Sequence, residues 1–349
     1  MIREILGQLA AGAELSPDAI ATFLAAVEQD SVGEAQIAAF LTGLRIKGAS
    51  VGETVAISRY LRARCTPVQP RVNAAILDTC GTGGGLSTVN ISTASAILCA
   101  AAGIPVAKHG SRSLSSLSGS ADVLEALGVS LAVPPLACAR MIEEIGIAFL
   151  HAPAFHPLMR RLLPVELALG FKTIFYTLIG PLINPASARC HLLGVYRPEL
   201  QTLCAEAVAQ LDYERAMIVH GLDGVDEISL LGSTRIHQLE HGQWRSYDLV
   251  PEDVGLARCT LEAIRSRTPA ENAAQLRAVF AGQQHGAVRD AIVLNTAGAL
   301  IVGGRASSFA DGIALASALL DEGAAHRKLQ QLVDSSQDYA RRGADGQHG

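Results

Sequence analysis

Two loops rich in glycine and hydroxyl side chains constrain the fold of this chain more than any other feature. The first is Asp78–Gly85, with the sequence Asp-Thr-Cys-Gly-Thr-Gly-Gly-Gly, and the second is Lys108–Asp122. Each loop follows a short apolar run and leads toward a helical pattern, which is typical of the β-loop-α units of a parallel sheet. Because ligands in such sheets bind at the carboxyl ends of the strands, both loops are predicted to face one site.

The rest of the chain extends this pattern into two predicted domains. Strands are predicted at 74–79 and 104–107 and helices at 92–102 and 118–127. The same alternation of strand, loop and helix continues through 215–219 and 291–302. We therefore expect a small helical domain over 1–66 and a large α/β domain with a mostly parallel central sheet over 72–349. The two prolines of Cys65–Arg71 indicate a linker between them. A middle helical segment near 157–185 is expected to pack on the N-terminal domain.

Three helix starts are predicted in the N-terminal part. Ser16 is a candidate N-cap because proline follows it at the first helical position. Ser31–Glu34 and Ser50–Glu53 both read Ser-Val-Gly-Glu, which predicts a capping box at each. The apolar face of the helix after Ser31 is predicted to carry Ile37, Phe40, Leu41 and Leu44.

Composition excludes several classes of protein. The net charge is −5 and the pI is near 6.1, which argues against a broad nucleic-acid-binding surface. The apolar run 94–107 is too short to span a bilayer and the N-terminus lacks a signal-peptide layout, so no membrane association is expected. The seven cysteines are scattered with no CxxC pair, which predicts reduced thiols in a soluble, cytoplasmic protein.

Both loops suit the binding of phosphate. Glycines let successive backbone N–H groups approach an anion, and Lys108 adds positive charge. The first loop is neither a Walker loop nor a GxGxxG fingerprint, so a purely structural turn is the alternative. Asn90–Thr93 adds polar side chains that either contact the ligand or only cap a helix, and His109 is either a ligand contact or structural. Two phosphate-binding loops fit a ribose 5-phosphate that carries a pyrophosphate.

A third motif predicts a metal site. Asp226 and Glu227 follow the apolar run 216–219, and adjacent carboxylates at the end of a strand are suitable ligands for Mg²⁺. The alternative is a solvated acidic loop. A pyrophosphate leaving group favours the metal, because Mg²⁺ would neutralise its charge.

With these elements assembled, the chain resembles the anthranilate phosphoribosyltransferase family over nearly its whole length. The resemblance also includes Phe40–Gly48, Ile179–Pro185, Leu193–Tyr196 and Thr268–Asn272. It implies a fold of the nucleoside phosphorylase/phosphoribosyltransferase type, a homodimer, Mg²⁺, and two substrates, phosphoribosyl pyrophosphate (PRPP) and an aromatic amine. In the family's reaction the amine attacks C1 of the ribose as pyrophosphate departs, helped mainly by orientation and electrostatics.

The resemblance also implies roles for individual residues. Lys108 and His109 would be catalytic, and Ser92, Asp226 and Glu227 would position the metal. The acceptor amine would lie against His109, Ser111, Pro153 and Glu166. The PRPP site would comprise Gly81, Thr82, Gly84, Gly85, Thr88, Asn90, Ser92, Thr93, Lys108, Ser115, Ser116 and Ser120.

Three positions depart from the family's pattern. The first loop continues as Gly85-Leu86-Ser87 where the family has Asp-Gly in a longer loop, and Ser111 replaces an asparagine. Glu166, ten residues after His156, stands where the family has the arginine that faces the anthranilate carboxylate. Two like charges about 4 Å apart repel by roughly 4 kcal/mol at an effective dielectric of about 20. We therefore predict a working donor site for which anthranilate is a poor acceptor or binds differently.

The best interpretation is a Mg²⁺-dependent phosphoribosyltransferase of tryptophan biosynthesis that uses anthranilate. A paralogue with another nitrogenous acceptor, which Glu166 and Ser111 suggest, is the first alternative. A non-catalytic module that binds PRPP and a nucleoside phosphorylase are further alternatives.

Overall fold

The computed structural model describes residues 1–113 and 117–345. Two of the predicted PRPP contacts, Ser115 and Ser116, lie outside the described residues. The N-terminal helices are α1 (Ile2–Ala10), α2 (Pro17–Glu28), α3 (Glu34–Lys47) and α4 (Val51–Arg64). The later helices are α5 (Ile91–Ala101), α6 (Ser120–Ala126), α7 (Pro135–Ile145), α8 (Ala152–Phe155), α9 (Met159–Leu169), α10 (Pro198–Val208), α11 (Leu261–Ile264), α12 (Pro269–Phe280), α13 (Ala287–Val302), α14 (Phe309–Asp321) and α15 (Ala324–Asp345). A π-helix (Phe175–Ile179) and 3₁₀ turns (Gly180–Leu182 and Pro251–Val254) complete the helical elements.

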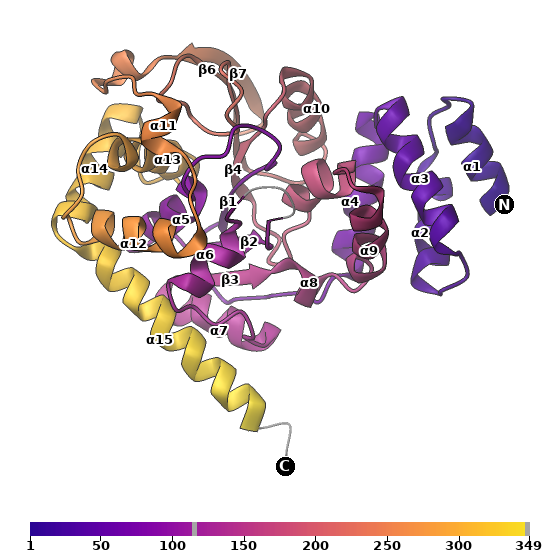
Figure 1. Cartoon of the computed structure of the whole chain (residues 1–349), viewed down its shortest axis with the longest axis horizontal. Helices are drawn as coiled ribbons and strands as arrows, with labels where there is room; N and C mark the ends of the chain where they lie inside the picture. The colour runs from indigo at the N-terminus through magenta and orange to yellow at the C-terminus, as the bar shows by residue number, and fades with distance from the viewer. Residues whose placement is uncertain (114–116, 346–349) are drawn as a thin grey trace.

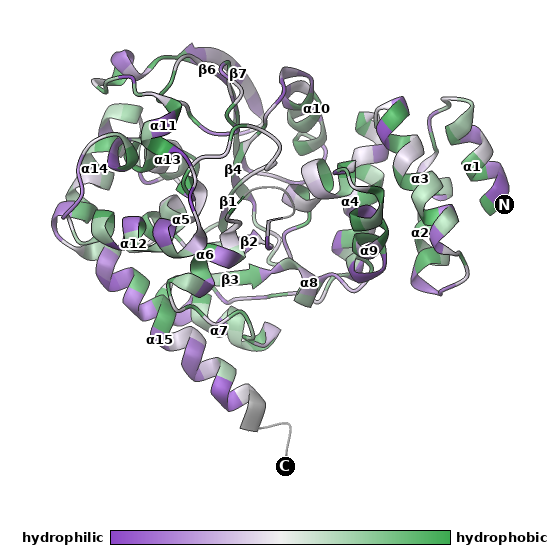
Figure 2. Cartoon of the chain, viewed as in Figure 1, coloured by the Kyte–Doolittle hydropathy of each residue, from purple (hydrophilic) through white to green (hydrophobic). Residues whose placement is uncertain are grey.

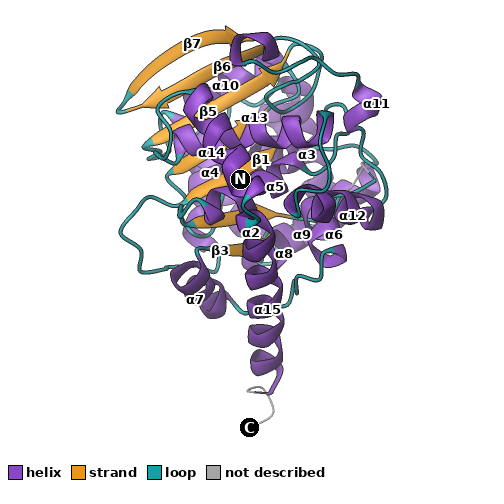
Figure 3. Cartoon of the chain, turned by 90° about the vertical axis from the view of Figure 1, so that its left-hand side faces the viewer, coloured by secondary structure: helices purple, strands orange, loops and turns teal. Residues whose placement is uncertain are grey.

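Seven strands of the described chain form one sheet in the order β3-β2-β1-β4-β5-β6-β7. The first five in this order pair in parallel, and β6 and β7 form an antiparallel extension. Figure 3 shows the strands stacked from β7 at the top to β3 below, with α15 extending further down. The strands are β1 (Leu77–Gly81), β2 (Val106–Gly110), β3 (Ile147–His151), β4 (Cys190–Gly194), β5 (Arg215–Gly221), β6 (Thr234–Glu240) and β7 (Gln243–Leu249). The predicted α/β fold with a mostly parallel sheet is confirmed.

Helices cover both faces of this sheet. Side chains alternate between the faces along a strand, so Leu192 and Met217 join the apolar core that includes α5 and α13. Their neighbours Leu193 and Ile218 join a separate core with α4 and α10. In Figure 2 strand β3 is mostly green, whereas α15 alternates green and purple along its length. Apolar residues on both sides of the same strand follow from burial of both faces of the sheet.

The N-terminal helices form their own apolar core beside the sheet (Figure 1). The rings of Phe23 and Phe40 stack with centroids 4.0 Å apart, and Phe175 lies 6.3 Å from Phe40. Leu158 and Leu162 belong to the same core, so the 157–185 segment packs on the N-terminal helices as expected. This segment therefore links the helical core to the sheet.

Two of the three predicted helix starts are confirmed. Ser16 accepts a hydrogen bond from the Ala19 N–H, and Ser50 and Glu53 form a reciprocal capping box. The prediction at Ser31 was wrong, because α3 begins after Gly33 and the Ser31 hydroxyl instead donates to the carbonyl of Ala26.

The second predicted strand also differs in its bounds. Lys108 and His109 were expected after it, but they are residues of β2, which pair with Phe149 and Leu150 of β3. The Asp78 carboxylate accepts the His109 N–H at 3.2 Å and stabilises this position. None of the described helices has an apolar stretch long enough to cross a bilayer.

We predict that Glu53→Ala destabilises the protein by about 3–5 kcal/mol, because it breaks a buried charged pair. Glu53 is 0% exposed. Its carboxylate accepts hydrogen bonds from the N–H groups of Leu15 and Ser50, both at 2.9 Å, and from Lys47 at 2.6 Å. Urea unfolding measures the change. Glu34→Ala, at an exposed position of α3, is the control and is expected to shift stability by less than about 0.5 kcal/mol. Equal effects of the two substitutions would contradict the prediction.

Candidate active site

Four neighbouring strands each end in a glycine at the same edge of the sheet. They are β2, β1, β4 and β5, ending in Gly110, Gly81, Gly194 and Gly221. A Cβ at Gly194 would overlap the backbone carbonyl of Asp226, and a Cβ at Gly81 would overlap its carboxylate. A Cβ at Gly110 would overlap the Ser120 hydroxyl. The absence of side chains therefore lets two loops lie directly on the strand ends.

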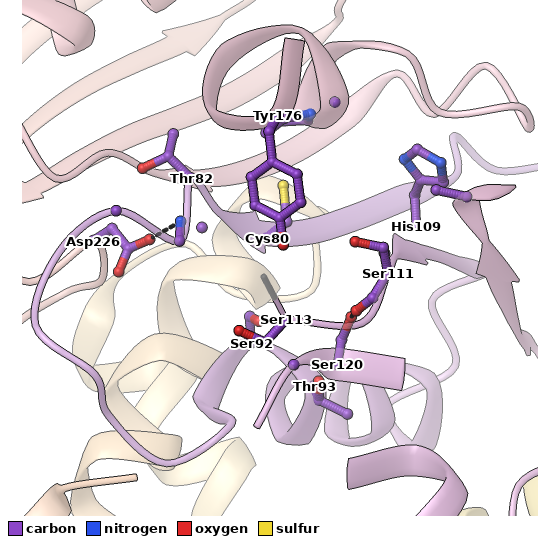
Figure 4. Close-up of a pocket in the computed structure, with 18 of the residues that line it drawn as sticks. Cys80, Thr82, Ser92, Thr93, His109, Ser111, Ser113, Ser120, Tyr176 and Asp226 are labelled. Atoms are coloured by element: carbon purple, nitrogen blue, oxygen red, sulfur yellow. Dashed lines mark hydrogen bonds between the residues drawn. The ribbon is translucent and has the colours of Figure 1, made fainter. Parts of the chain in front are cut away.

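A pocket opens at this edge (Figure 4). The structure places nearly all of the predicted site residues in its lining. From the first loop and α5 these are Gly81, Thr82, Gly84, Gly85, Thr88, Asn90, Ser92 and Thr93, and from elsewhere Lys108, His109, Ser111, Ser120, Pro153, Asp226 and Glu227. Glu166 does not belong to the lining.

Asp226 and Glu227 lie beneath the first loop. The Asp226 carboxylate accepts the Gly83 N–H at 2.6 Å, and Glu227 accepts the Thr88 hydroxyl at 3.3 Å. Burial raises the pKa of both carboxyls, and the Asp226 charge adds to the rise at Glu227. The second Glu227 oxygen has no hydrogen-bond partner among the described residues. Ser92 lines a small adjoining cavity together with both acids. Unpartnered buried oxygens of this kind fit a divalent cation such as Mg²⁺.

Asn90 ties the two predicted phosphate loops together. Its side-chain N–H₂ donates to the carbonyls of Ser118 and Gly119, both at 3.2 Å, and its oxygen accepts the Ser118 hydroxyl at 3.1 Å. Asn90 precedes α5 but makes no side-chain capping bond there. The alternative that this residue only caps the helix therefore does not hold.

The opposite wall of the pocket contains two histidines. His109 and His156 are both buried, with ring centroids 5.1 Å apart in an edge-to-face arrangement. Burial lowers the pKa of both, to about 4 for His156, and at His109 the nearby His156 and Lys108 charges lower it further. Both imidazoles are thus neutral near pH 7. The His109 Nε2 and both His156 ring nitrogens have no hydrogen-bond partner among the described residues.

Lys108 lies at the floor of the pocket. Its ammonium donates to the carbonyl of Thr79, in the middle of β1, at 2.6 Å. The side chain is 3% exposed, so its charge lies in a largely desolvated position close to the first loop. A buried ammonium in this place is available to counter the charge of an anion.

The 152–181 segment contributes further lining residues that were not among the predicted site residues. Lys172 donates to the Gly83 carbonyl and lies 4.9 Å over the ring of Tyr176. The Tyr176 hydroxyl donates to the Arg112 carbonyl at 3.1 Å. In Figure 4 this ring points into the pocket between the Asp226 side and the His109 side. His156 and Arg160 also line the pocket. The sequence signal available for these lining residues was the presence of polar side chains in the otherwise mostly apolar 152–181 segment.

Glu166 was expected to face the acceptor, and the structure differs. The side chain is 2% exposed, and its carboxylate accepts the Thr173 N–H within the same segment. Burial raises the pKa of this carboxyl. Because Glu166 is turned away from the pocket, the expected repulsion of an acceptor carboxylate does not follow from its position.

Comparison with known proteins agrees with this geometry. Residues 73–326 match the α/β domain of a glycosyl transferase family, and residues 3–65 match the helical bundle domain of a glycosyl transferase family. The anthranilate phosphoribosyltransferase of Acetivibrio thermocellus is 42% identical over 340 residues, which cover 97% of this chain and 98% of that protein. The chain belongs to the anthranilate phosphoribosyltransferase family.

Solved structures of anthranilate phosphoribosyltransferases share the fold. The Thermus thermophilus enzyme superposes with a TM-score of 0.88 at 38% identity, covering 95% of this chain and 99% of that one. The Saccharomyces cerevisiae enzyme in complex with PRPP and Mg superposes with a TM-score of 0.85 at 27% identity, covering 97% and 98%. The small helical part and the α/β part are thus arranged alike in all three proteins.

We predict that Gly194→Ala destabilises the protein by about 1–3 kcal/mol, because its methyl group would overlap the Asp226 backbone. Gly7→Ala is the control, since a Cβ at this helical position meets nothing within 4 Å. The control is expected to be neutral or stabilising by up to about 1 kcal/mol. Thermal and urea unfolding of both variants check this, and an unaffected Gly194→Ala would refute the close-approach argument.

Proposed function

We propose that this protein transfers the ribose 5-phosphate of PRPP to the amino group of anthranilate and releases pyrophosphate, a reaction of tryptophan biosynthesis. The observation that carries the proposal is that the two glycine- and serine-rich loops, the buried carboxylates and the neutral His109 and His156 line the same pocket. The 42% identity to a relative of that name supports the same reaction.

The donor is proposed to lie along the glycine-lined edge. The first loop, Asn90 and the serine-rich loop would bind its phosphates through N–H and hydroxyl groups, with Lys108 near the leaving group. Ser115 and Ser116 remain part of this proposal, although they lie outside the described residues. Ser92, Asp226 and Glu227 would hold Mg²⁺, which would neutralise the charge of the pyrophosphate.

The acceptor is proposed to lie against the histidine wall, with Ser111 and Pro153 beside it. The amine nitrogen forms a bond to C1 while the bond from C1 to the pyrophosphate oxygen breaks, and pyrophosphate leaves with the electron pair. The nitrogen, now positively charged, then gives one proton to solvent or to the departing pyrophosphate. Because His109 and His156 are neutral, each can donate or accept a hydrogen bond without placing a positive charge beside the cationic sugar.

A paralogue that rejects anthranilate is not favoured. That alternative rested mainly on Glu166 facing the acceptor, whereas the side chain is buried outside the pocket lining. A module that only binds PRPP is not favoured either, because the short first loop is its only support.

We further propose that residues 1–66 and 72–349 are the two domains, and that the protein is a cytoplasmic homodimer joined through the helical domain. Ile46, an apolar side chain 81% exposed at the end of α3, supports such an interface. The seven free cysteines fit a reducing compartment.

Steady-state kinetics with PRPP, anthranilate and Mg²⁺ test the proposed reaction. We expect equal amounts of pyrophosphate and phosphoribosyl anthranilate, and loss of turnover when Mg²⁺ is chelated. Binding of PRPP without turnover of anthranilate would leave the paralogue and the binding module, and pyrophosphate release with any other aromatic amine would exclude the binding module. Phosphate-dependent release of a base from a nucleoside would instead indicate a phosphorylase.

We predict that Glu166→Gln leaves the KM for anthranilate within about twofold of wild type, because the carboxylate is turned away from the pocket. A tenfold lower KM would show that the Glu166 charge does repel the acceptor, as the sequence suggested, by about 1.4 kcal/mol.

The same variant is predicted to change the pH dependence of stability. The folded-state pKa of Glu166 lies above its ordinary 4.5, so the folded state disfavours the charged form. The protonated Glu166 side chain therefore contributes to the stability of the folded protein below pH 4.5. This contribution is lost as the pH rises through the folded-state pKa and the group ionises. Glu166→Gln, which keeps an oxygen for the Thr173 N–H, should remove this loss. Unfolding measurements between pH 4 and 8 should show wild type losing stability relative to the variant, and parallel curves would contradict this.

A further inference from the structure

We propose that Arg160 binds the carboxylate of the acceptor. This inference rests on the proposed function and specifies how the acceptor is recognised. Anthranilate carries a carboxylate beside its reacting amine, and an anion that leaves water for a partly buried pocket requires a cationic partner. The structure must supply that partner from residues other than Glu166, which has the wrong charge and lies outside the pocket lining.

Three Lys or Arg side chains line the pocket among the described residues, namely Lys108, Arg160 and Lys172. Lys108 is buried and donates to the carbonyl of Thr79, which belongs to the first loop. Lys172 donates to the Gly83 carbonyl, and the Asp226 charge acts on it. Both ammonium groups therefore belong to the donor end of the pocket.

Arg160 lies at the acceptor end. It follows His156 by one helical turn, in the first turn of α9. Its Nε donates to the Pro153 carbonyl at 2.8 Å, which fixes the guanidinium beside a proline that also lines the pocket. Its Nη groups make no hydrogen bond or ion pair with the rest of the described chain.

The surroundings of Arg160 suit an aromatic acid. Met159 and Leu163 from the same helix line the pocket beside it, as do Pro153 and His156. These side chains provide apolar and aromatic surface for a ring, and the anchored guanidinium provides two parallel donors. A planar guanidinium held by one of its five N–H groups keeps the geometry for a bidentate bond to a carboxylate.

The next residue provides a matched control. Arg161 forms an ion pair with Asp30 of the helical part and does not line the pocket. Its charge is the same and its position differs by one residue, so replacing it tests the general effect of removing a cation from α9.

Steady-state kinetics of Arg160→Ala, Arg160→Lys and Arg161→Ala test the proposal. We expect Arg160→Ala to raise the KM for anthranilate by about 10- to 100-fold, with the KM for PRPP unchanged within twofold. Arg160→Lys should recover part of the lost affinity for anthranilate, because lysine keeps the positive charge but lacks the two parallel N–H donors of the guanidinium. Arg161→Ala should resemble wild type. With 2-aminobenzamide, which lacks the carboxylate charge, wild type and Arg160→Ala should have equal KM values.

An anthranilate KM within twofold of wild type in Arg160→Ala, or an equal loss with the amide, would overturn the proposal. Fluorescence titration of anthranilate into the protein with Mg²⁺ and pyrophosphate distinguishes failure of the Arg160 proposal from failure of the proposed function. If wild type binds anthranilate at least tenfold more tightly than Arg160→Ala but does not turn it over, Arg160 recognition stands and the proposed reaction falls. If wild type does not bind anthranilate, both are overturned.

Discussion

The close approach of the 223–227 loop to the strand ends is the contact on which the site depends. Gly81 and Gly194 pair across β1 and β4, and Asp226 lies where their side chains would be. Because no Cβ intervenes, the Asp226 carboxylate reaches the Gly83 N–H, and Glu227 reaches Thr88. The first loop, the two acids and the end of the sheet are thus held as one unit.

Electrostatics divides the pocket into two ends. Carboxylates and ammonium groups occupy the proposed donor end, where burial raises the pKa of Asp226 and Glu227, and a bound cation would stabilise the deprotonated form of both. Neutral imidazoles form the acceptor end, because burial lowers the pKa of His109 and His156. In the proposed function, the charged groups near the leaving pyrophosphate would therefore lie apart from the neutral imidazoles beside the reacting amine.

The 152–183 segment joins this pocket to the helical domain. Leu158, Leu162 and Phe175 pack in the core of the N-terminal helices, while Lys172 and Tyr176 contact the two phosphate loops. Arg45 of α3 also donates to the Lys172 carbonyl at 2.5 Å. Packing of the helical domain thereby sets the position of side chains in the site.

The amino-acid sequence was enough to predict the α/β fold and the two glycine-rich loops, because these features are local. Glycines after apolar runs specify both the turn and the strand end, and the family resemblance then assigned roles to residues near Gly81 and Lys108. The side chains on the acceptor side of the pocket depend instead on tertiary packing. Glu166 lies in α9 two residues after Pro164, and its carboxylate accepts the Thr173 N–H in a buried position. The residue that the family resemblance assigned to the acceptor is therefore buried outside the pocket lining, whereas Arg160 and Tyr176 line the pocket.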